Sequence, residues 1–496
     1  MHSFSIKSSV FIALFFIFTI QVQAQQHYKL ADYVNPDFRY HSLDFTLNLN
    51  TNNNLSHYEF DNSSLFKNSY SNFNGNLNVA YYQIKNTVRY QGTQSIRLYT
   101  EGSWHKSFSD SHTSQSNYTS TNQLRNFYTQ LYYTSTNRFY NARKQFLEII
   151  PEMNLNLQRD RYTYDANPMY YPFNTQGISK SNDLTFGLSV MIGMGRIENV
   201  ENARLALYML NDLQKRGDVK KNLSNEQVDQ LARFITKLRN KRFFDSRLRN
   251  IAEITAVDSL LTAMGIREHA GAGYFMTLND DWNYANGPIR QSGHRFAFGV
   301  TPGYSYDLSE ITQDNILNSG DPSTRTVSGD KTHFTALDFV AYYYLERPVS
   351  LTWQHSTRVS LGFQLKKQVH NVVTDPTSDF KNTVNNPNLH VSLEKIYGYY
   401  PNSRTSLALD LKLGGLYEMQ KQLDAGEAKN HDLTLYASVV LSGNYYFSPR
   451  LRLNLNVGAN DIYEHLDDLI GTSGHSVGYS NSWNPGFSLS LRYSIF

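Results

Sequence analysis

Twelve charged side chains stand at alternate positions of segments in which every second residue is apolar. Alternation of this kind places the charged residues on one face of a segment and the apolar residues on the other. On the wall of a water-filled pore such side chains would select ions by the sign of their charge. In a closed interior they would have to form ion pairs with one another. Both signs occur, so either interpretation is open. The twelve residues are Asp44, Arg97, Glu101, Glu148, Glu152, Asp183, Asp338, Arg358, Glu394, Asp410, Lys412 and Arg452.

A second group of charges lies between residues 198 and 268, where the apolar period is helical. Arg233, Lys237 and Lys241 follow one another at i, i+4 and i+8, so they share one face of a helix. A basic face could contact anionic lipid head groups or an acidic partner. The simpler interpretation is a solvated face of a small helical domain, and the sequence leaves both open.

Motifs for metal or covalent chemistry are sparse. There is no glycine-rich phosphate loop and no HExxH pair. Asp280-Asp281 beside Asn279 offers oxygen ligands but lacks the spacing of a calcium loop, so a solvated turn is the simpler interpretation. Cysteine is absent, which excludes disulfides and thiolate chemistry. We therefore expect no metal site and no cofactor.

The clearest structural elements lie in the last quarter of the chain. Leu433, Leu435, Ala437, Val439 and Leu441 occupy one parity, and the alternation restarts after Ser448-Pro449. The alternating runs are about 12–17 residues long, whereas strands of globular proteins usually have about 3–10. A tilted strand needs about 9–11 residues to cross a membrane. The pattern predicts membrane-spanning strands with the apolar parity toward lipid and the polar parity toward a lumen.

Connections of two kinds alternate along the chain. Tight turns at 346–348, 401–402 and 448–449 separate long polar links at 307–331, 367–387, 419–430 and 463–483. The sequence thus predicts an all-β transmembrane antiparallel up-and-down barrel of about 14 strands. Residues 25–197 would hold strands one to six, and residues 292–496 strands seven to fourteen. We expect a bulge at Pro151 and a tyrosine girdle at the tight-turn end, including Tyr342–Tyr344 and Tyr445–Phe447.

Helical periodicity interrupts the strands between Glu198 and Glu268. Val228, Leu231, Ile235 and Leu238 form one apolar stripe, and this stripe follows a capping-box pattern, Ser224 with Gln227 three residues later. Because the segment follows an even number of strands, we expect it to be a periplasmic helical insert, 198–268. The connector 269–291 fits neither period and stays unassigned.

The first 24 residues resemble a secretory signal peptide. Lys7 precedes the apolar run 10–20, and Val22-Gln23-Ala24 is a small-residue cleavage pattern. The net charge of +3 is too small to indicate a nucleic-acid partner. The mean hydropathy is negative, which suits strands that are polar on one face. We expect export through a cleaved signal peptide at 1–24.

Together the signal, the alternating strands and the terminal LSLRYSIF resemble Gram-negative outer-membrane β-barrel proteins. That resemblance implies residence in the outer membrane, contact with its lipid, and recognition of the terminal Phe496 by the barrel-assembly machinery. Tyr128-Thr129-Gln130 is similar to a tripeptide of outer-membrane phospholipases. Neither His294 nor Ser480-Asn481 supplies the accompanying His and Ser arrangement.

The sequence favours a channel or transporter for small polar solutes. One alternative is a docking barrel whose insert holds a cell-envelope partner, such as anionic lipid or a periplasmic protein. A second is a barrel-embedded hydrolase, which would need a Ser, His and carboxylate within hydrogen-bond reach. We expect no enzyme activity and no nucleic-acid partner.

Overall fold

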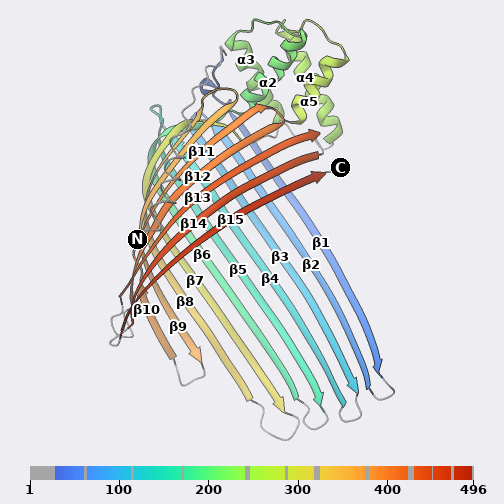
Figure 1. The fold of residues 1–496 in the computed structure, drawn as a ribbon, viewed down its shortest axis with the longest axis vertical. Helices are drawn as coiled ribbons and strands as arrows, with labels where there is room; N and C mark the ends of the chain where they lie inside the picture. The colour runs from blue at the N-terminus through green and yellow to red at the C-terminus, as the bar shows by residue number, and fades with distance from the viewer. Residues whose placement is uncertain are drawn as a thin grey trace.

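The computed structural model describes residues 28–60, 64–112, 117–168, 173–240, 246–284, 289–317, 324–374, 379–422, 429–448, 451–470 and 474–493. Within these ranges, one antiparallel sheet contains every named strand, and four helices interrupt the chain between β6 and β7. Figure 1 shows the helices gathered at one end of the strands. The predicted signal peptide, 1–24, and Phe496 lie outside the described residues.

The strands follow one another around the sheet in chain order. Their bounds are β1 (Phe38–Phe60), β2 (Ser64–Thr87), β3 (Tyr90–His112), β4 (Asn117–Tyr140), β5 (Gln145–Pro168), β6 (Phe173–Asn199), β7 (Gln291–Leu317), β8 (Thr324–Pro348), β9 (Trp353–Thr374), β10 (Asp379–Asn385), β11 (Asn388–Asn402), β12 (Thr405–Gln422), β13 (Lys429–Ser448), β14 (Leu451–Ile470) and β15 (Gly474–Tyr493). This order confirms the predicted up-and-down architecture.

β10 and β11 act as a single crossing of the sheet. Both pair with β9 on one side and with β12 on the other. They are separated only by Asn386 and Pro387, and Pro387 has no backbone N–H to give to the ladder. Counted this way, the described residues cross the sheet fourteen times, as predicted.

The register puts apolar residues on one face of the sheet from strand to strand. Leu47 lies opposite Leu77, Val190 opposite Val300, and Leu361 opposite Val391. The other face is the concave one, because side chains from distant strands meet there. Tyr342 on β8 donates a hydrogen bond to Glu148 on β5, three strands away. We call this concave polar face the lumen face.

Most strands are longer than the sequence indicated. β6 and β7 each contain 27 residues, and the predicted link 307–331 is largely the ends of β7 and β8. A membrane core needs only about 9–11 residues of each strand. Beyond the membrane both faces of a strand can be polar. The Asn- and Ser-rich strand ends therefore show no alternation that would identify them.

The predicted bulge at Pro151 is wrong. Thr134 pairs with Glu152 and Asn137 pairs with Ile149, so the register is the same on both sides of the proline. The β4–β5 ladder loses the pairs between these positions, since Pro151 has no N–H to donate. Pro302 interrupts the β6–β7 ladder in the same way, again without a register shift.

The predicted tyrosine girdle is only half correct. Tyr343, Tyr445 and Phe447 lie on the outer face, where each is 38–52% exposed. Tyr342 and Tyr446 point to the lumen face. Consecutive residues of a strand point to opposite faces, so a run of three aromatics can supply at most two to a girdle.

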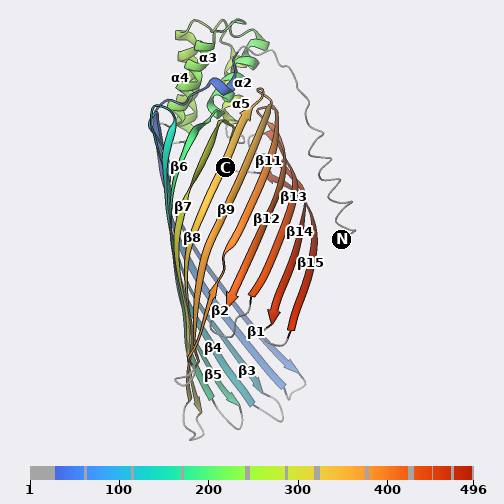
Figure 2. The same cartoon turned by 90° about the vertical axis from the view of Figure 1, so that its left-hand side faces the viewer.

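β1 and β15 are the two edges of the sheet, and the described residues contain no pairing between them. On both edges the apolar parity is strongly exposed, for example Phe45 at 68% and Phe487 at 69%. Figure 2 shows β14 and β15 curving away from the flat wall formed by β6 to β9, with β1 and β2 behind.

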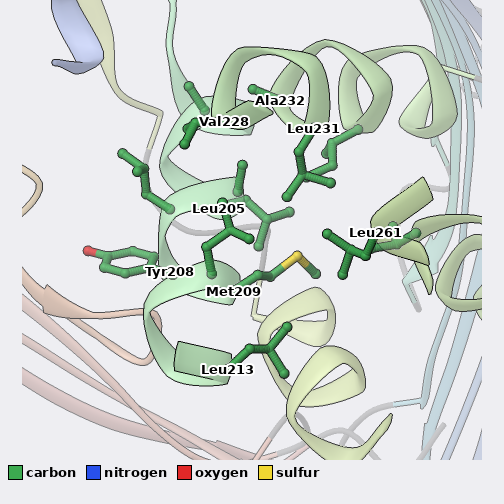
Figure 3. Close-up of a cluster of buried hydrophobic side chains, with 14 of the residues drawn as sticks. Leu205, Tyr208, Met209, Leu213, Val228, Leu231, Ala232 and Leu261 are labelled. Carbon is green, nitrogen blue, oxygen red and sulfur yellow. The ribbon is translucent and has the colours of Figure 1, made fainter. Parts of the chain in front are cut away.

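The helical insert has four described helices, α2 (Glu201–Arg216), α3 (Asn225–Arg239), α4 (Ser246–Ala263) and α5 (Ala272–Asn283). α5 lies in the previously unassigned connector. The helices share one apolar core, in which Leu205, Met209, Leu231 and Leu261 are at most 2% exposed (Figure 3). Ser224 and Gln227 form the predicted capping box of α3. None of the described helices has the length and apolarity needed to cross a membrane.

Candidate functional site

All twelve predicted charges lie on the lumen face. The register pairs Asp183 with Asp307, Glu152 with Gly187, and Glu394 with Arg358, always opposite in parity to the apolar rows. Their roles in selecting or passing solutes remain predictions. Their surroundings divide them into charges with an opposite charge in contact and charges held by neutral groups.

Two ion-paired groups stand near the helical end of the lumen face. Arg358 contacts Glu346 at 3.2 Å and Glu394 at 2.9 Å. Glu148, only 1% exposed, pairs with Arg138 at 2.6 Å and accepts the Tyr342 hydroxyl. Buried carboxylates are stable only with such partners. These residues therefore form structural contacts and contribute little free charge to the lumen.

Five of the remaining predicted charges contact neutral groups or rings in the described structure. Arg97 donates to Asn78 at 2.8 Å, Glu101 accepts from Tyr99 at 2.5 Å, and Asp183 accepts from Asn156 at 2.8 Å. Lys412 lies over the Tyr436 ring, and Arg452 donates to the Tyr446 hydroxyl. A charge whose partners are neutral is not cancelled by a counter-charge, so its electrostatic potential can act on a passing solute.

Two lumen carboxylates are incompletely satisfied. Asp338 and Asp410 each have one buried oxygen that accepts no hydrogen bond from the described residues. A buried acceptor without a donor is costly unless water or a solute supplies one. The lumen face therefore has open hydrogen-bonding capacity at these two positions, while Asp44 on the edge strand β1 is exposed.

An apolar cluster on the lumen face was not anticipated from the sequence. Tyr140, Phe146, Met191, Ala297 and Tyr342 are each at most 8% exposed and pack together across β4 to β8. The sequence does contain a sign of this cluster, because each member is an apolar or aromatic residue at a position of the alternation where polar residues are expected. This cluster therefore adds a layer of packed side chains to the lumen face near the helical end.

The N-terminal segment ties the helical insert to the start of the sheet. Tyr33, 1% exposed, contacts Thr236 of α3 through its hydroxyl at 2.8 Å. Asn35 donates to the backbone oxygen of Asn199 at 2.7 Å, at the end of β6. Tyr28 and Leu30 join the helical core. The segment before β1 therefore lies at the same end of the sheet as the helices.

Arg290 fixes the exit of the helical insert to the β8–β9 turn. Its side chain is fully buried and donates to the backbone oxygens of Ser350, Leu351 and Trp353. The guanidinium also lies over the Tyr400 ring, 5.1 Å from its centroid. Burial lowers the pKa of Arg290 to about 10. It remains charged at neutral pH, with carbonyl oxygens in place of water.

Further contacts join the helices to turns beyond β9. Tyr208 of α2 donates to the backbone oxygen of Tyr400 at 2.8 Å. Asp280 of α5 pairs with Arg404 in the β11–β12 turn at 2.6 Å. The Tyr284 ring contacts the Tyr446 ring near the β13–β14 turn. The insert thus contacts the sheet from β6 to β13, about half of its width, and lies across the short-turn end (Figures 1 and 2).

The predicted basic face is partly neutralised. Arg233 is 44% exposed but pairs with Asp229 on the same helix at 2.5 Å. Lys237 is exposed, and Lys241 lies outside the described residues. Two other basic residues of the insert, Arg239 and Arg249, contact Glu201 and Glu253. Within the described residues, little of the basic cluster is left for an external partner.

Residues of the hydrolase alternative do not come together. Tyr128 lies on the lumen face and donates to Asn156, whereas His294 lies on the outer parity of β7. Among the described residues, Thr332 contacts His370 at 2.9 Å, and Asp330 lies 3.9 Å from the same ring. A 3.9 Å separation is too long for the hydrogen bond that would orient the base.

The two acids considered as calcium ligands have other surroundings, since Asp280 pairs with Arg404 and Asp281 is buried. Within the described part of the chain, no group of three or more His, Cys, Asp or Glu side chains is arranged to hold a metal ion.

No protein-family model matches the chain, and no curated protein matches it significantly. Among solved structures, the translocator domain of the autotransporter NalP from Neisseria meningitidis is similar over 83% of this chain and 90% of that one. The identity to NalP is 8% and the TM-score is 0.20.

Two further solved structures have the same degree of similarity. The β domain of the Bordetella autotransporter Brka aligns over 79% of this chain and 98% of that one, at 10% identity and a TM-score of 0.20. The P. putida toluene transporter TodX aligns over 94% and 92%, at 9% identity and a TM-score of 0.20. TM-scores this low carry no argument about fold or mechanism, so the description of the fold rests on the strand order and the two faces described above.

Proposed function

We propose that the protein is an outer-membrane channel for small polar solutes, with the helical insert as a periplasmic lid over one mouth. The observation that carries this proposal is the lumen face. It holds charges of both signs, several of them with neutral partners, and two carboxylates with spare acceptor capacity. A polar inner face opposite an apolar outer face is what a water-filled barrel needs.

The position of the insert supports a lid. Its contacts run from the β8–β9 turn to the β13–β14 turn, and buried or partly buried polar groups, Arg290 and Asp280, make the closest of them. A subdomain that spans the mouth in this way can restrict passage without a plug inside the barrel. Export through the predicted signal peptide and recognition of Phe496 by the assembly machinery belong to the same proposal.

The docking barrel remains the alternative, and Lys237 is the exposed side chain that supports it. Arg233 gives less support, because its charge is already paired with Asp229 on the same helix. The hydrolase alternative has less support than the docking barrel, because Asp330 is too far from His370 for a hydrogen bond. We therefore propose a protein without enzyme activity.

Liposome swelling tests the channel proposal. Proteoliposomes holding the purified full chain should swell in small neutral solutes such as glycerol and arabinose, and more slowly as solute size increases. Heat-denatured protein at the same lipid ratio is the control. Swelling no faster than this control, with insertion verified by protease protection, would favour the docking barrel.

A further inference from the structure

A cavity of ≈ 360 Å³ opens on the lumen face between β4 and β8. It lies at the level of Phe186 and Leu188, which face outward within the apolar run of β6. Binding pockets for small molecules typically measure about 300–1,000 Å³, so this cavity suits a ligand near the lower limit.

The floor of the cavity is a run of three residues with almost no side chain. The register aligns Glu152, Gly187, Gly303, Ala336 and Lys366 in one row across five strands. A Cβ atom added to Gly187 would meet nothing within 4 Å. The row therefore leaves open space over three adjacent strands, bounded by a carboxylate on one side and an ammonium on the other.

Hydroxyl groups border this floor on two sides. In the neighbouring row toward the far strand ends, Thr185 and Ser305 contact each other at 3.2 Å. In the row toward the helical end, Thr301 donates to Ser189 at 2.8 Å. Each hydroxyl has one donor and two acceptor positions, so each pair keeps unused capacity for a ligand.

Aromatic rings stand at the ends of the cavity. Tyr132 on β4 is 39% exposed, and Phe334 lies on the lumen side of β8 with Lys366 over its ring. Ring faces and a few placed polar groups are the usual lining of a small-molecule site. Glu152 adds one carboxylate, which accepts from Thr134 at 3.4 Å.

We propose that this cavity binds one ring of a neutral mono- or disaccharide during passage through the lumen. A sugar ring presents hydroxyls around its edge, to match Thr185 and Ser305, and an apolar face, to match Tyr132 or Phe334. The inference rests on the channel function proposed above, because the sugar must reach the cavity through the lumen.

Calorimetry with maltose and the detergent-purified full chain tests the cavity without requiring conduction. The expected result is saturable binding that Gly187→Phe weakens at least tenfold, since the new ring occupies the open floor. The matched control is Gly102→Phe, because Gly102 also has nothing within 4 Å of an added Cβ but faces outward. Phe334→Ala should also weaken maltose binding about tenfold. This variant replaces Gly187→Phe in the test if Gly187→Phe does not fold.

Current block in planar bilayers separates the two proposals. Maltose should reduce the ion current through the wild type and through Gly102→Phe at the concentrations that saturate binding. A conducting protein that binds no maltose overturns the cavity and leaves the channel. Binding without any current overturns the channel and leaves the cavity. Choline binding in place of maltose, lost on Glu152→Gln, would make the cavity a cation site and overturn the sugar proposal.

Discussion

Asp281 is the buried acid at the junction between the helical insert and the sheet. It is 2% exposed, and its Oδ2 atom accepts no hydrogen bond from the described residues. Burial, together with the nearby carboxylates of Asp212 and Asp280, raises the pKa of Asp281 to about 7. The Ser403 hydroxyl and Lys215 act in the opposite direction. Asp281 therefore titrates in the physiological range.

Replacing Asp281 with asparagine should stabilise the docked insert at high pH only. The folded-state pKa lies above the unfolded value of 3.8, so the wild type loses stability as the pH rises from about 4 to about 7. Above pH 7 the penalty is of order 1–4 kcal/mol. Urea unfolding followed by helical circular dichroism at pH 4 and pH 8 measures it. The same pH dependence in both proteins would contradict the assignment.

Some residue-level features followed from the sequence and others did not. The capping box of Ser224 and Gln227 is local, so the spacing was enough to predict it. The parity of the twelve charges followed from the alternation of their own strands. Arg290 and Tyr342 act on partners about 60 and 194 residues away in the chain. No local pattern contains that information, so the contacts of these two side chains were not predicted.

Among the elements, the two edge strands, β1 and β15, each have one edge whose backbone groups are unpaired in the described sheet. Unpaired backbone groups cannot remain in a bilayer, where each costs several kcal/mol. β1 and β15 carry apolar outer faces on odd-numbered positions, for example Leu47 and Leu489. Only a register that pairs odd-numbered residues of β1 with odd-numbered residues of β15 keeps the apolar faces of both strands toward lipid. We therefore expect β1 and β15 to pair in the membrane and close the barrel.

Cysteine pairs test this closure in a chain that has no cysteine of its own. Leu47→Cys combined with Phe487→Cys, Leu489→Cys or Leu491→Cys should form a disulfide at one of the three positions, because opposed residues lie about 4.5–5.5 Å apart. Ser488→Cys should not react, since it faces the lumen. The pair Leu455→Cys and Leu489→Cys, which are opposite in the β14–β15 register, is the positive control. Crosslinking in the control alone would argue against closure.

Strand ends were the elements least accessible from sequence. β1 continues through an Asn-rich stretch to Phe60, and β3 continues through Ser and His residues to His112. Within the membrane the lipid imposes alternation, whereas beyond it water accepts polar residues on both faces. The sequence therefore predicted the alternating part of these strands and misread polar strand ends, such as most of 307–331, as loop.

At the scale of the whole molecule, the lumen face and the insert form one arrangement. The packed cluster of Phe146, Tyr342 and their neighbours lies on the lumen face near the helical end, and the insert lies over the same end. Passage through the barrel would therefore be controlled at the short-turn mouth. Loosening the insert should increase flow without altering the lumen charges.

Single-channel recording in planar bilayers tests this account most directly. The wild type should give discrete current steps, and Arg290→Met should increase the mean current, because the insert loses the three backbone acceptors that hold it to the β8–β9 turn. Lys237→Gln, at an exposed position on the insert, should leave the current unchanged. If neither the wild type nor Arg290→Met carries current, although protease protection shows both inserted in the bilayer, the lumen is sealed and the protein is not a channel.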